Sequence, residues 1–444
     1  MSLCKGKKLN LIIFHLESIS SSCYYRNLPQ LENIENIRVK SHCFSNYFST
    51  ATSTIMTVAD LLLGDQYAFE TSKNLEYFYL KSHERSLLKD LEEEGYIARA
   101  FKTPESKANV DLKDFPIVFG DISHRNDYQY DYSTFCCEIE RTIKQKTPFA
   151  LYIDDAITHL AYRNGSRIDA LTWHKKFAES LKRMDNTVAN ILNWLKEAGK
   201  EQSTVLVFVG DHGDSYWTHG LFEGYTHSIP PYPDVIQTPL FIYIPGERQR
   251  MINELVATPD IKNLIHSILN GKMEIPERKH VFSRNLYINQ ISASDRLHKG
   301  YSITDGNFMI VLDKDGLQMF SLAGGYNNCC NLLDFFHYKN GTLKRANYLQ
   351  DITNEHACFN LMDLLDEVEE IFPDLLGALS DEMKNLCNYA EINVPYLIWI
   401  KKIHYCQHYN QYSRCHGRWF YMWENIKYKL KQQKLIRKIW NAVR

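Results

Sequence analysis

Apolar residues in the first half of the chain alternate between short continuous runs and helix-like spacing. Continuous runs of strand length predict strands at 9–17, 96–101, 148–154, 203–210 and 238–244. Between them, apolar positions recur every three or four residues over 54–63, 84–95 and 174–199. Each of these helical segments ends at or just before a glycine, a common helix stop. This alternation predicts an α/β fold with a doubly wound, mostly parallel sheet flanked by helices.

The pattern changes after about residue 275. Residues 300–321 contain short apolar runs separated by Asp305-Gly306 and Asp315-Gly316, which predict tight turns and a small antiparallel sheet. Residues 346–390 have an acidic, helical pattern. We therefore expect three parts: an α/β domain over 1–275, an antiparallel subdomain over 276–345, and a helical region with a basic aromatic tail over 346–444.

Composition adds few constraints. The 444 residues suffice for one large α/β domain and a smaller one. With 44% hydrophobic residues, 23% charged residues and a net charge of −2, bulk electrostatics indicate no particular partner. Eleven cysteines include the adjacent pairs Cys136-Cys137 and Cys329-Cys330, which rarely suit structural bridges. This usage favours reduced thiols in a cytosolic compartment.

The amino-terminal apolar stretch resembles a signal peptide only superficially. It covers residues 9–14, and His15 and Glu17 interrupt it before any small-residue cleavage site. No segment approaches the roughly 20 apolar residues of a transmembrane helix. We expect a cytoplasmic protein, with contact to the inner face of the membrane if its tail binds lipid.

Polar residues stand at the ends of three predicted strands, where open α/β sheets place their active sites. Glu17 follows the first strand, and His159 follows the strand over 148–154. Asp211-His212 follows the run over 203–210 and is bracketed by glycines. Burying an acid and a histidine is costly unless a charged group satisfies them. Carboxylates and imidazoles are the ligand set of a zinc or manganese site.

A hydroxyl-rich segment, 49–54, leads into the helix predicted at 54–63. A hydroxyl at a helix amino terminus lies near the positive end of the dipole, which favours its alkoxide and any anion bound beside it. Coordination to a metal would activate it further as a nucleophile. Because Ser and Thr are also preferred helix caps, the choice among Thr52, Ser53 and Thr54 stays open.

The order and spacing of these motifs resemble the sulfatase and alkaline-phosphatase superfamily, closest to its threonine-nucleophile phosphoethanolamine and phosphoglycerol transferases. The resemblance covers roughly residues 8–335. Four motifs carry it: the strand ending at Glu17, Thr54 opening a helix ten residues before a glycine, His159 after a Pro-Phe-x-Leu-Tyr strand, and Asp211-His212-Gly-Asp with His219-Gly eight residues on. Residues 300–332 are similar to the carboxyl-terminal small sheet of sulfatases.

Two departures place the chain within that superfamily. Sulfatases require Cys or Ser within Cys/Ser-x-Pro-x-Arg, whereas this chain has Thr54, Met56 and Val58 in place of the nucleophile, the proline and the arginine. Threonine cannot give the formylglycine aldehyde, so a phosphothreonine-type intermediate fits instead. In addition, related lipid-to-glycan transferases carry amino-terminal membrane helices that this sequence does not show, which argues against a phospholipid donor on the outer face.

The resemblance implies a role for each motif residue. Glu17, Thr54, Asp211 and His212 would hold a divalent metal, with zinc as the first choice and manganese or calcium as alternatives. His159 and His219 would bind the transferred group, protonate the leaving oxygen or hold a second metal. His227, in a proline-rich loop, is a further candidate for substrate contact.

The activity that follows is the transfer of a substituted phosphoryl group through Thr54, from a phospho-donor to a surface glycan, its precursor or a small-molecule acceptor. One alternative is a phosphodiesterase, phosphonate or sulfate-ester hydrolase of the same superfamily. A second alternative is a non-catalytic glycan-binding scaffold in polysaccharide synthesis. We expect no nucleic-acid partner, because no fold for that purpose is apparent.

Structural alternatives exist for each candidate residue. Asp211-His212 could be a helix cap beside a core histidine, and Glu17 could face solvent after its strand. His159 and His219 could be structural only. His15 alternates with Glu17, so we expect it to be packed or hydrogen-bonded rather than catalytic.

The tail over 414–444 carries nine Lys or Arg residues against one acid, Glu424, interleaved with Trp, Tyr and Phe. A basic helix with aromatic anchors is typical of segments that lie on an anionic membrane surface. A helix packed on the protein's own surface is the alternative.

Overall fold

A seven-stranded sheet forms the centre of the molecule. The computed structural model describes residues 8–66, 69–71, 78–80, 84–102, 132–159, 173–216, 225–226, 230–285, 300–312, 317–322, 331–339, 342–345 and 359–389. The strand order is β12-β2-β11-β8-β1-β7-β6. The strands span Asn10–Leu16 (β1), His42–Phe44 (β2), Ile97–Lys102 (β6), Phe149–Asp154 (β7), Thr204–Gly210 (β8), Leu240–Tyr243 (β11) and Arg250–Ile252 (β12).

Most neighbouring strands of this sheet run parallel. β1 lies between β7 and β8 and pairs with both in parallel, and β6 pairs with β7 in parallel. β11 is antiparallel to both β8 and β2. The prediction of a mostly parallel, doubly wound sheet is therefore confirmed.

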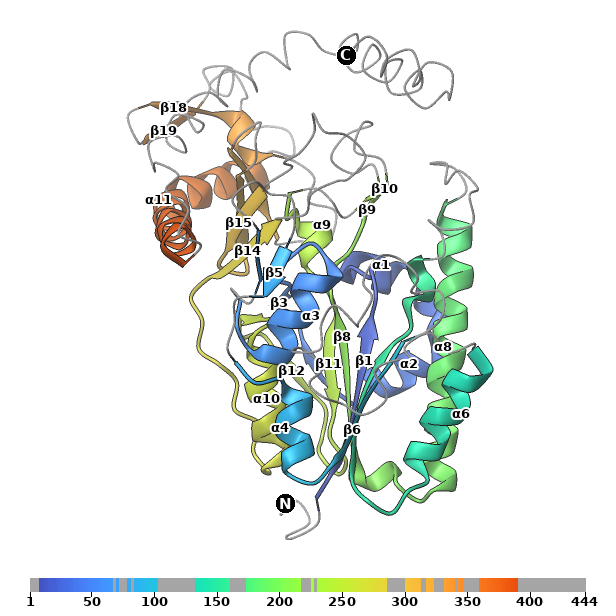
Figure 1. Ribbon diagram of the computed structural model, residues 1–444. Coiled ribbons are helices and arrows are strands. Elements are labelled where there is room, and N and C mark those ends of the chain that lie inside the picture. The colour runs from blue at the N-terminus through green and yellow to red at the C-terminus, as the bar shows by residue number, and fades with distance from the viewer. Residues whose placement is uncertain are drawn as a thin grey trace, which may run out of the picture.

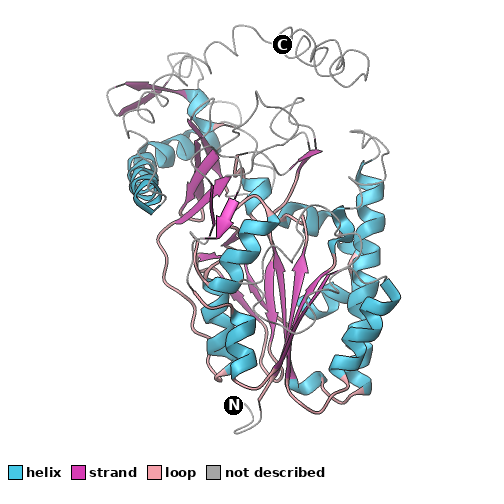
Figure 2. Ribbon diagram, in the orientation of Figure 1, coloured by secondary structure: helices cyan, strands magenta, loops and turns pink. Residues whose placement is uncertain are grey.

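Helices cover both faces of the sheet, as Figure 1 and Figure 2 show. One face carries α3 (Thr54–Leu63), α4 (Leu87–Glu93) and α10 (Asp260–Leu269). The other carries α1 (Ser21–Arg26), α2 (Glu32–Arg38), α6 (Tyr132–Ile143) and α8 (Trp173–Glu197). Side chains of a strand alternate between faces, and accordingly Ile13 belongs to the core under α3 whereas Phe14 belongs to the core under α8.

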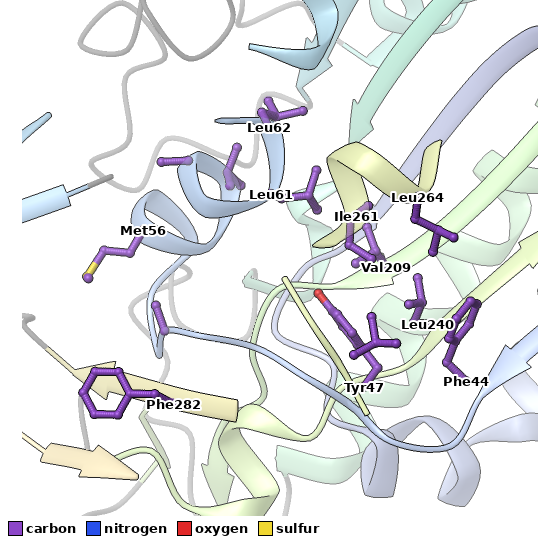
Figure 3. Close-up of a cluster of buried hydrophobic side chains, with 14 of the residues drawn as sticks. Phe44, Tyr47, Met56, Leu61, Leu62, Val209, Leu240, Ile261, Leu264 and Phe282 are labelled. Carbon is purple, nitrogen blue, oxygen red and sulfur yellow. The ribbon is translucent and has the colours of Figure 1, made fainter. Parts of the chain in front are cut away.

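The core under α3 and α10 joins the sheet to the helix that begins at Thr54. Figure 3 shows Ile261 and Leu264 of α10 gathered near Val209 of β8 and Leu240 of β11. All four side chains are at most 2% exposed. α3 ends at Gly64, whose φ of 71° is the left-handed conformation that glycine adopts most readily. Leu61 and Leu62 of α3 belong to the same core, so burial of these apolar side chains holds that helix against this face of the sheet.

A second, four-stranded antiparallel sheet lies beside the first, confirming the small antiparallel sheet predicted for the carboxyl-terminal part. It is formed by β14 (Val281–Asn285), β15 (Gly300–Thr304), β16 (Phe308–Leu312) and β17 (Leu317–Ser321), and α11 (Phe359–Tyr389) packs against it. The turn before β16 is held by Asp305, whose Oδ1 accepts from the N–H groups of Asn307 and Phe308. This sheet reaches the hydroxyl-rich loop, because the N–H of Arg284 donates to the carbonyl of Thr50 at 3.0 Å.

Short elements complete the described chain. The remaining strands are Tyr47–Phe48 (β3), Phe69–Thr71 (β4), Phe78–Leu80 (β5), Ser215–Tyr216 (β9), Tyr225–Thr226 (β10), Val256–Ala257 (β13), Phe336–Lys339 (β18) and Thr342–Arg345 (β19). The remaining helical turns are Pro233–Ile236 (α9), Leu28–Gln30 (η1), Ala156–His159 (η4), Glu201–Ser203 (η5) and Leu332–Phe335 (η6).

The basic tail over 414–444 lies outside the described residues, so its membrane contact stays a prediction. Among the helices that the structure does describe, none combines the length and apolar character needed to cross a membrane.

Candidate metal centre

The polar residues at the ends of β1, β7 and β8 meet at one edge of the sheet. The strand register pairs Leu16 with Gly210 and His15 with Asp154, so the carboxyl ends of the three strands are level. The ligand-capable atoms of Glu17, Asp211 and His212 lie within 4.8 Å of one another. All three residues are at most 2% exposed. The alternative in which Glu17 faces solvent is therefore wrong.

Ser18 ties the end of β1 to the end of β8. Its N–H donates to Oδ1 of Asp211 at 2.9 Å, and its hydroxyl donates to Oε1 of Glu17 at 3.1 Å. Ser18 has a φ of 57°, the left-handed region that residues with a Cβ seldom adopt. From the neighbouring turn η4, the Thr158 hydroxyl donates to the carbonyl of Glu17 at 2.6 Å. A strained backbone conformation persists only where surrounding contacts impose it. The contacts of Ser18 and Thr158 therefore fix the carboxylates of Glu17 and Asp211 relative to each other.

The loop after β8 aims Asp211 and His212 at the same point. Oδ1 of Asp211 also accepts from the N–H of His212 at 2.7 Å. Nδ1 of His212 lies 3.0 Å from the carbonyl of Gly213, to which it donates. This contact leaves the lone pair of His212 on Nε2, which lies 3.2 Å from Oδ2 of Asp211. An imidazole oriented in this way is suited to binding a cation.

Gly213 is required by close packing beneath that loop. A Cβ at this position would lie 2.4 Å from the carbonyl oxygen of Asp234 and 2.5 Å from Cβ of Ser20. The N–H of Gly213 donates to the carbonyl of Val235 at 2.6 Å. The glycine of the Asp-His-Gly sequence therefore lets the chain pass between two neighbouring segments while its ligand-capable residues face the sheet edge.

Thr54 is the hydroxyl residue that contacts this cluster. It is the first residue of α3, and its Oγ1 donates to Oε1 of Glu17 at 3.0 Å and lies 3.2 Å from Nε2 of His212. Ser53 occupies the cap position but makes no side-chain cap hydrogen bond. Among the described residues, Oγ1 of Thr52 is buried without a hydrogen-bond partner, and the hydroxyl of Thr50 donates to Asp60 at 2.6 Å. The contacts thus favour Thr54 among the hydroxyls left open by the sequence.

His15 and Asp154 join the cluster, and sequence reasoning did not assign either of them to it. Ligand-capable atoms of His15, Glu17 and Asp154 also lie within 4.8 Å of one another. Burial lowers the pKa of His15, but the carboxylates of Asp211 and Asp154 outweigh it and raise that pKa to about 9. Asp154 is the last residue of β7, so the strand-end position that identified Glu17 and Asp211 could also have identified it.

Of the remaining predicted site residues, the structure describes only the backbone of His159. His159 ends η4, the turn whose Thr158 contacts Glu17, but its side chain lies outside the description. His219 and His227 lie outside the described residues. Their predicted roles stay predictions.

The chemistry of the cluster fits a divalent cation. Two carboxylates and an imidazole converge, with a hydroxyl beside them, which is a donor set that zinc and manganese accept. Oδ2 of Asp211 is buried and makes no aligned hydrogen bond. Buried carboxylates are costly without a compensating charge, and a cation held by Glu17, Asp211 and His212 would supply it.

Comparison with known proteins agrees with this arrangement. The family model described as Sulfatase matches residues 10–270, which include Glu17, Thr54, Asp211 and His212. An arylsulfatase of Clostridium perfringens is 26% identical over 191 residues, covering 39% of this chain and 37% of the relative. An endo-4-O-sulfatase of Bacteroides thetaiotaomicron is 24% identical over 332 residues, covering 72% of this chain and 61% of the relative.

The fold is also that of solved structures with little sequence identity. The phosphonate monoester hydrolase of Agrobacterium radiobacter superposes with a TM-score of 0.54 at 12% identity, covering 73% of this chain and 92% of that one. The chain spans less than two thirds of the length of the two curated relatives. Because the family model covers more than half of the sequence and the whole strand-end cluster, the chain belongs to the sulfatase family.

Proposed function

We propose that the chain is a metal-dependent phosphotransferase that moves a substituted phosphoryl group through Thr54. The observation that carries this proposal is the position of the Thr54 hydroxyl, 3.0 Å from Glu17 and 3.2 Å from His212 at the amino terminus of α3. The helix dipole there favours an alkoxide and a bound anion. A divalent cation on Glu17, Asp211 and His212, with Thr54 beside it, would stabilise negative charge on the phosphoryl oxygens.

Thr54 also determines which ester is the better substrate. Oxidation of a Cys or Ser at this position would give formylglycine, but the β-carbon of threonine carries a methyl group and cannot give that aldehyde. A direct attack by Oγ1 on phosphorus needs no such modification. The identity of residue 54 therefore supports phosphorus chemistry over sulfate-ester hydrolysis by the formylglycine route.

The reaction has two displacement steps. In the first, Oγ1 of Thr54 forms a bond to phosphorus, the bond from phosphorus to the leaving oxygen breaks, and the hydroxyl proton departs along its hydrogen bond to Glu17. We propose His159 or His219 as the group that protonates the leaving oxygen. In the second step an acceptor hydroxyl attacks phosphorus and gives its proton to the histidine that protonated the leaving oxygen. The bond from phosphorus to Oγ1 breaks, and the proton held by Glu17 returns to Oγ1 and restores the Thr54 hydroxyl.

Hydrolysis is the second candidate, and it differs only in the acceptor. If water takes the place of the acceptor hydroxyl, the same residues hydrolyse a phosphodiester or a phosphonate. Hydrolysis of a sulfate ester belongs to the same alternative, and the names of the two curated relatives, both sulfatases, support it. The resemblance to phosphoethanolamine and phosphoglycerol transferases supports a surface glycan or its precursor as acceptor.

Mass spectrometry of the purified chain after incubation with candidate phospho-donors and Mn²⁺ or Zn²⁺ tests the proposal. We expect an adduct on Thr54 that is absent in Thr54→Ala and present in Ser53→Ala, which removes the adjacent hydroxyl only. Loss of the adduct in water alone would indicate a hydrolase, whereas loss only on addition of a glycan would indicate a transferase. An adduct that persists in Thr54→Ala would move the nucleophile elsewhere. Metal binding without any adduct or turnover would favour the scaffold.

A further inference from the structure

Two buried polar side chains, His15 and Tyr152, lie directly behind the candidate metal ligands. His15 is on β1 and Tyr152 on the adjacent β7, and both are at most 3% exposed. Nδ1 of His15 makes a 2.5 Å hydrogen bond with the Tyr152 hydroxyl. Nε2 of His15 faces the ligands, 3.1 Å from Oδ2 of Asp211 and 3.6 Å from Oε2 of Glu17. The imidazole thus connects Tyr152 to the carboxylates of the centre.

The two nitrogens of His15 face different protein atoms, one through a hydrogen bond and the other through an ion-pair contact. Nδ1 faces Tyr152, and Nε2 faces the Asp211 carboxylate. The Tyr152 ring meets the imidazole edge-on, with ring centroids 5.7 Å apart. β7 is hydrogen-bonded to β1 on one side and to β6 on the other, so the backbone of Tyr152 is held in place. His15 is therefore placed beside Asp211, with its Nε2 directed at the carboxylate that it would support.

Only one of the two carboxylate oxygens of Asp211, Oδ2, lacks hydrogen bonds from the backbone. Its Oδ1 accepts two backbone hydrogen bonds, from Ser18 and His212. Its Oδ2, the oxygen nearer to Nε2 of His212, is instead faced by the His15 ring and has no aligned hydrogen bond. A carboxylate held at both oxygens loses less freedom when it binds a ligand, and residues behind metal ligands commonly orient them.

We propose that Tyr152 and His15 form a positioning pair that holds Oδ2 of Asp211 toward the centre and thereby sets its affinity for a divalent cation. This inference rests on the proposed function, because the cation is the one assigned there to Glu17, Asp211 and His212. Tyr152 fixes the imidazole, and Nε2 of His15 fixes the carboxylate.

Titration calorimetry with Mn²⁺ on the chelator-treated full chain tests the pair. His15→Gln keeps a donor nitrogen close to the Nε2 position, whereas His15→Leu keeps the bulk without a donor. Both changes remove the titratable ring, so the comparison isolates the donor. We expect the Kd of His15→Leu to be about 10- to 100-fold higher than that of His15→Gln, the range typical of residues that support metal ligands. Tyr152→Phe should raise Kd about tenfold relative to wild type.

Two further measurements separate positioning from general stability. Tyr24→Phe removes a buried hydroxyl that contacts Glu35 at 3.3 Å, away from the centre, and should leave Kd unchanged. The electron paramagnetic resonance spectrum of bound Mn²⁺ should change in Tyr152→Phe and not in Tyr24→Phe. If His15→Leu does not fold, the Tyr152→Phe result decides alone.

The contrary results are distinct. Equal Kd values for His15→Gln and His15→Leu, or an unchanged Kd in Tyr152→Phe, would overturn the positioning role while leaving the proposed function intact. Two bound ions in the wild type, one of them lost in His15→Leu, would make His15 a ligand and also overturn it. A wild-type chain that binds no divalent ion would overturn the proposed function together with this inference.

Discussion

The pH dependence of folding stability gives a quantitative test of the charge balance within the strand-end cluster. The perturbation is a rise in pH from about 6 to 10 in the presence of a chelator, with His15→Gln as the reference chain. Burial lowers the pKa of His15, but the carboxylates of Asp211, Asp154 and Glu17 together outweigh it and raise that pKa from 6.5 to about 9. In the folded chain the imidazole therefore keeps its proton to a higher pH than in the unfolded chain.

The sign and size of the effect follow from this difference. Between pH 6.5 and about 9 the folded state binds a proton that the unfolded state has lost, so stability falls as pH rises. The stabilisation is fully present below pH 6.5 and is lost as pH passes through about 9. At about 1.4 kcal/mol for each unit of pKa difference, the loss amounts to about 3 kcal/mol. This loss is a sizeable fraction of the free energy of unfolding of a typical protein, which is about 5–15 kcal/mol.

Urea denaturation of both chains at a series of pH values measures this loss. The difference in unfolding free energy between wild type and His15→Gln should fall by about 3 kcal/mol across the range, mostly between pH 7 and 9. Titrating groups remote from His15 are common to both chains and cancel in the difference. A difference that stays constant with pH, or one that grows as pH rises, would refute the assigned charge balance.

Two further predictions concern the backbone that supports the ligands, and both are measured by urea denaturation. Gly213→Ala should destabilise the chain by about 1–3 kcal/mol and loosen metal binding, because its Cβ would lie 2.4 Å from the carbonyl oxygen of Asp234; a wild-type stability would contradict the packing described. Ser18→Gly should change the unfolding free energy by less than about 1 kcal/mol, since relief of the positive φ offsets the lost hydroxyl hydrogen bond. Ser18→Val should cost about 1–3 kcal/mol, because a β-branched residue is strained at that φ, and equal stabilities for the two variants would count against this account.

The central sheet could be predicted from the sequence because its strands are continuous apolar runs. β1, β7 and β8 are buried along their whole length, and this produces the uninterrupted pattern that identified them. β2 and β12 have only three residues each, too few for a period to be recognised. α10 was not among the predicted helices, although its apolar residues from Ile261 to Ile268 recur at helical spacing. The same pattern that predicted α3 could therefore have predicted α10.

The site could be predicted only in part, because its residues depend on different kinds of information. Glu17 and Asp211 end apolar strands, and that local feature sufficed to select them. The contact between His15 and Tyr152 depends on the register of β1 against β7, which aligns His15 with Asp154. No local pattern encodes that register. For this reason the support behind Asp211 became apparent only in three dimensions.

The most direct test of the central claim is the position of a bound metal relative to Thr54. Anomalous X-ray diffraction from crystals grown with Mn²⁺ or Zn²⁺ locates the ion without reference to any assumed ligand. We expect one strong peak about 2.0–2.3 Å from carboxylate oxygens of Glu17 and Asp211 and from Nε2 of His212, with Oγ1 of Thr54 beside it. A peak elsewhere on the chain, with no density between these side chains, would contradict the account.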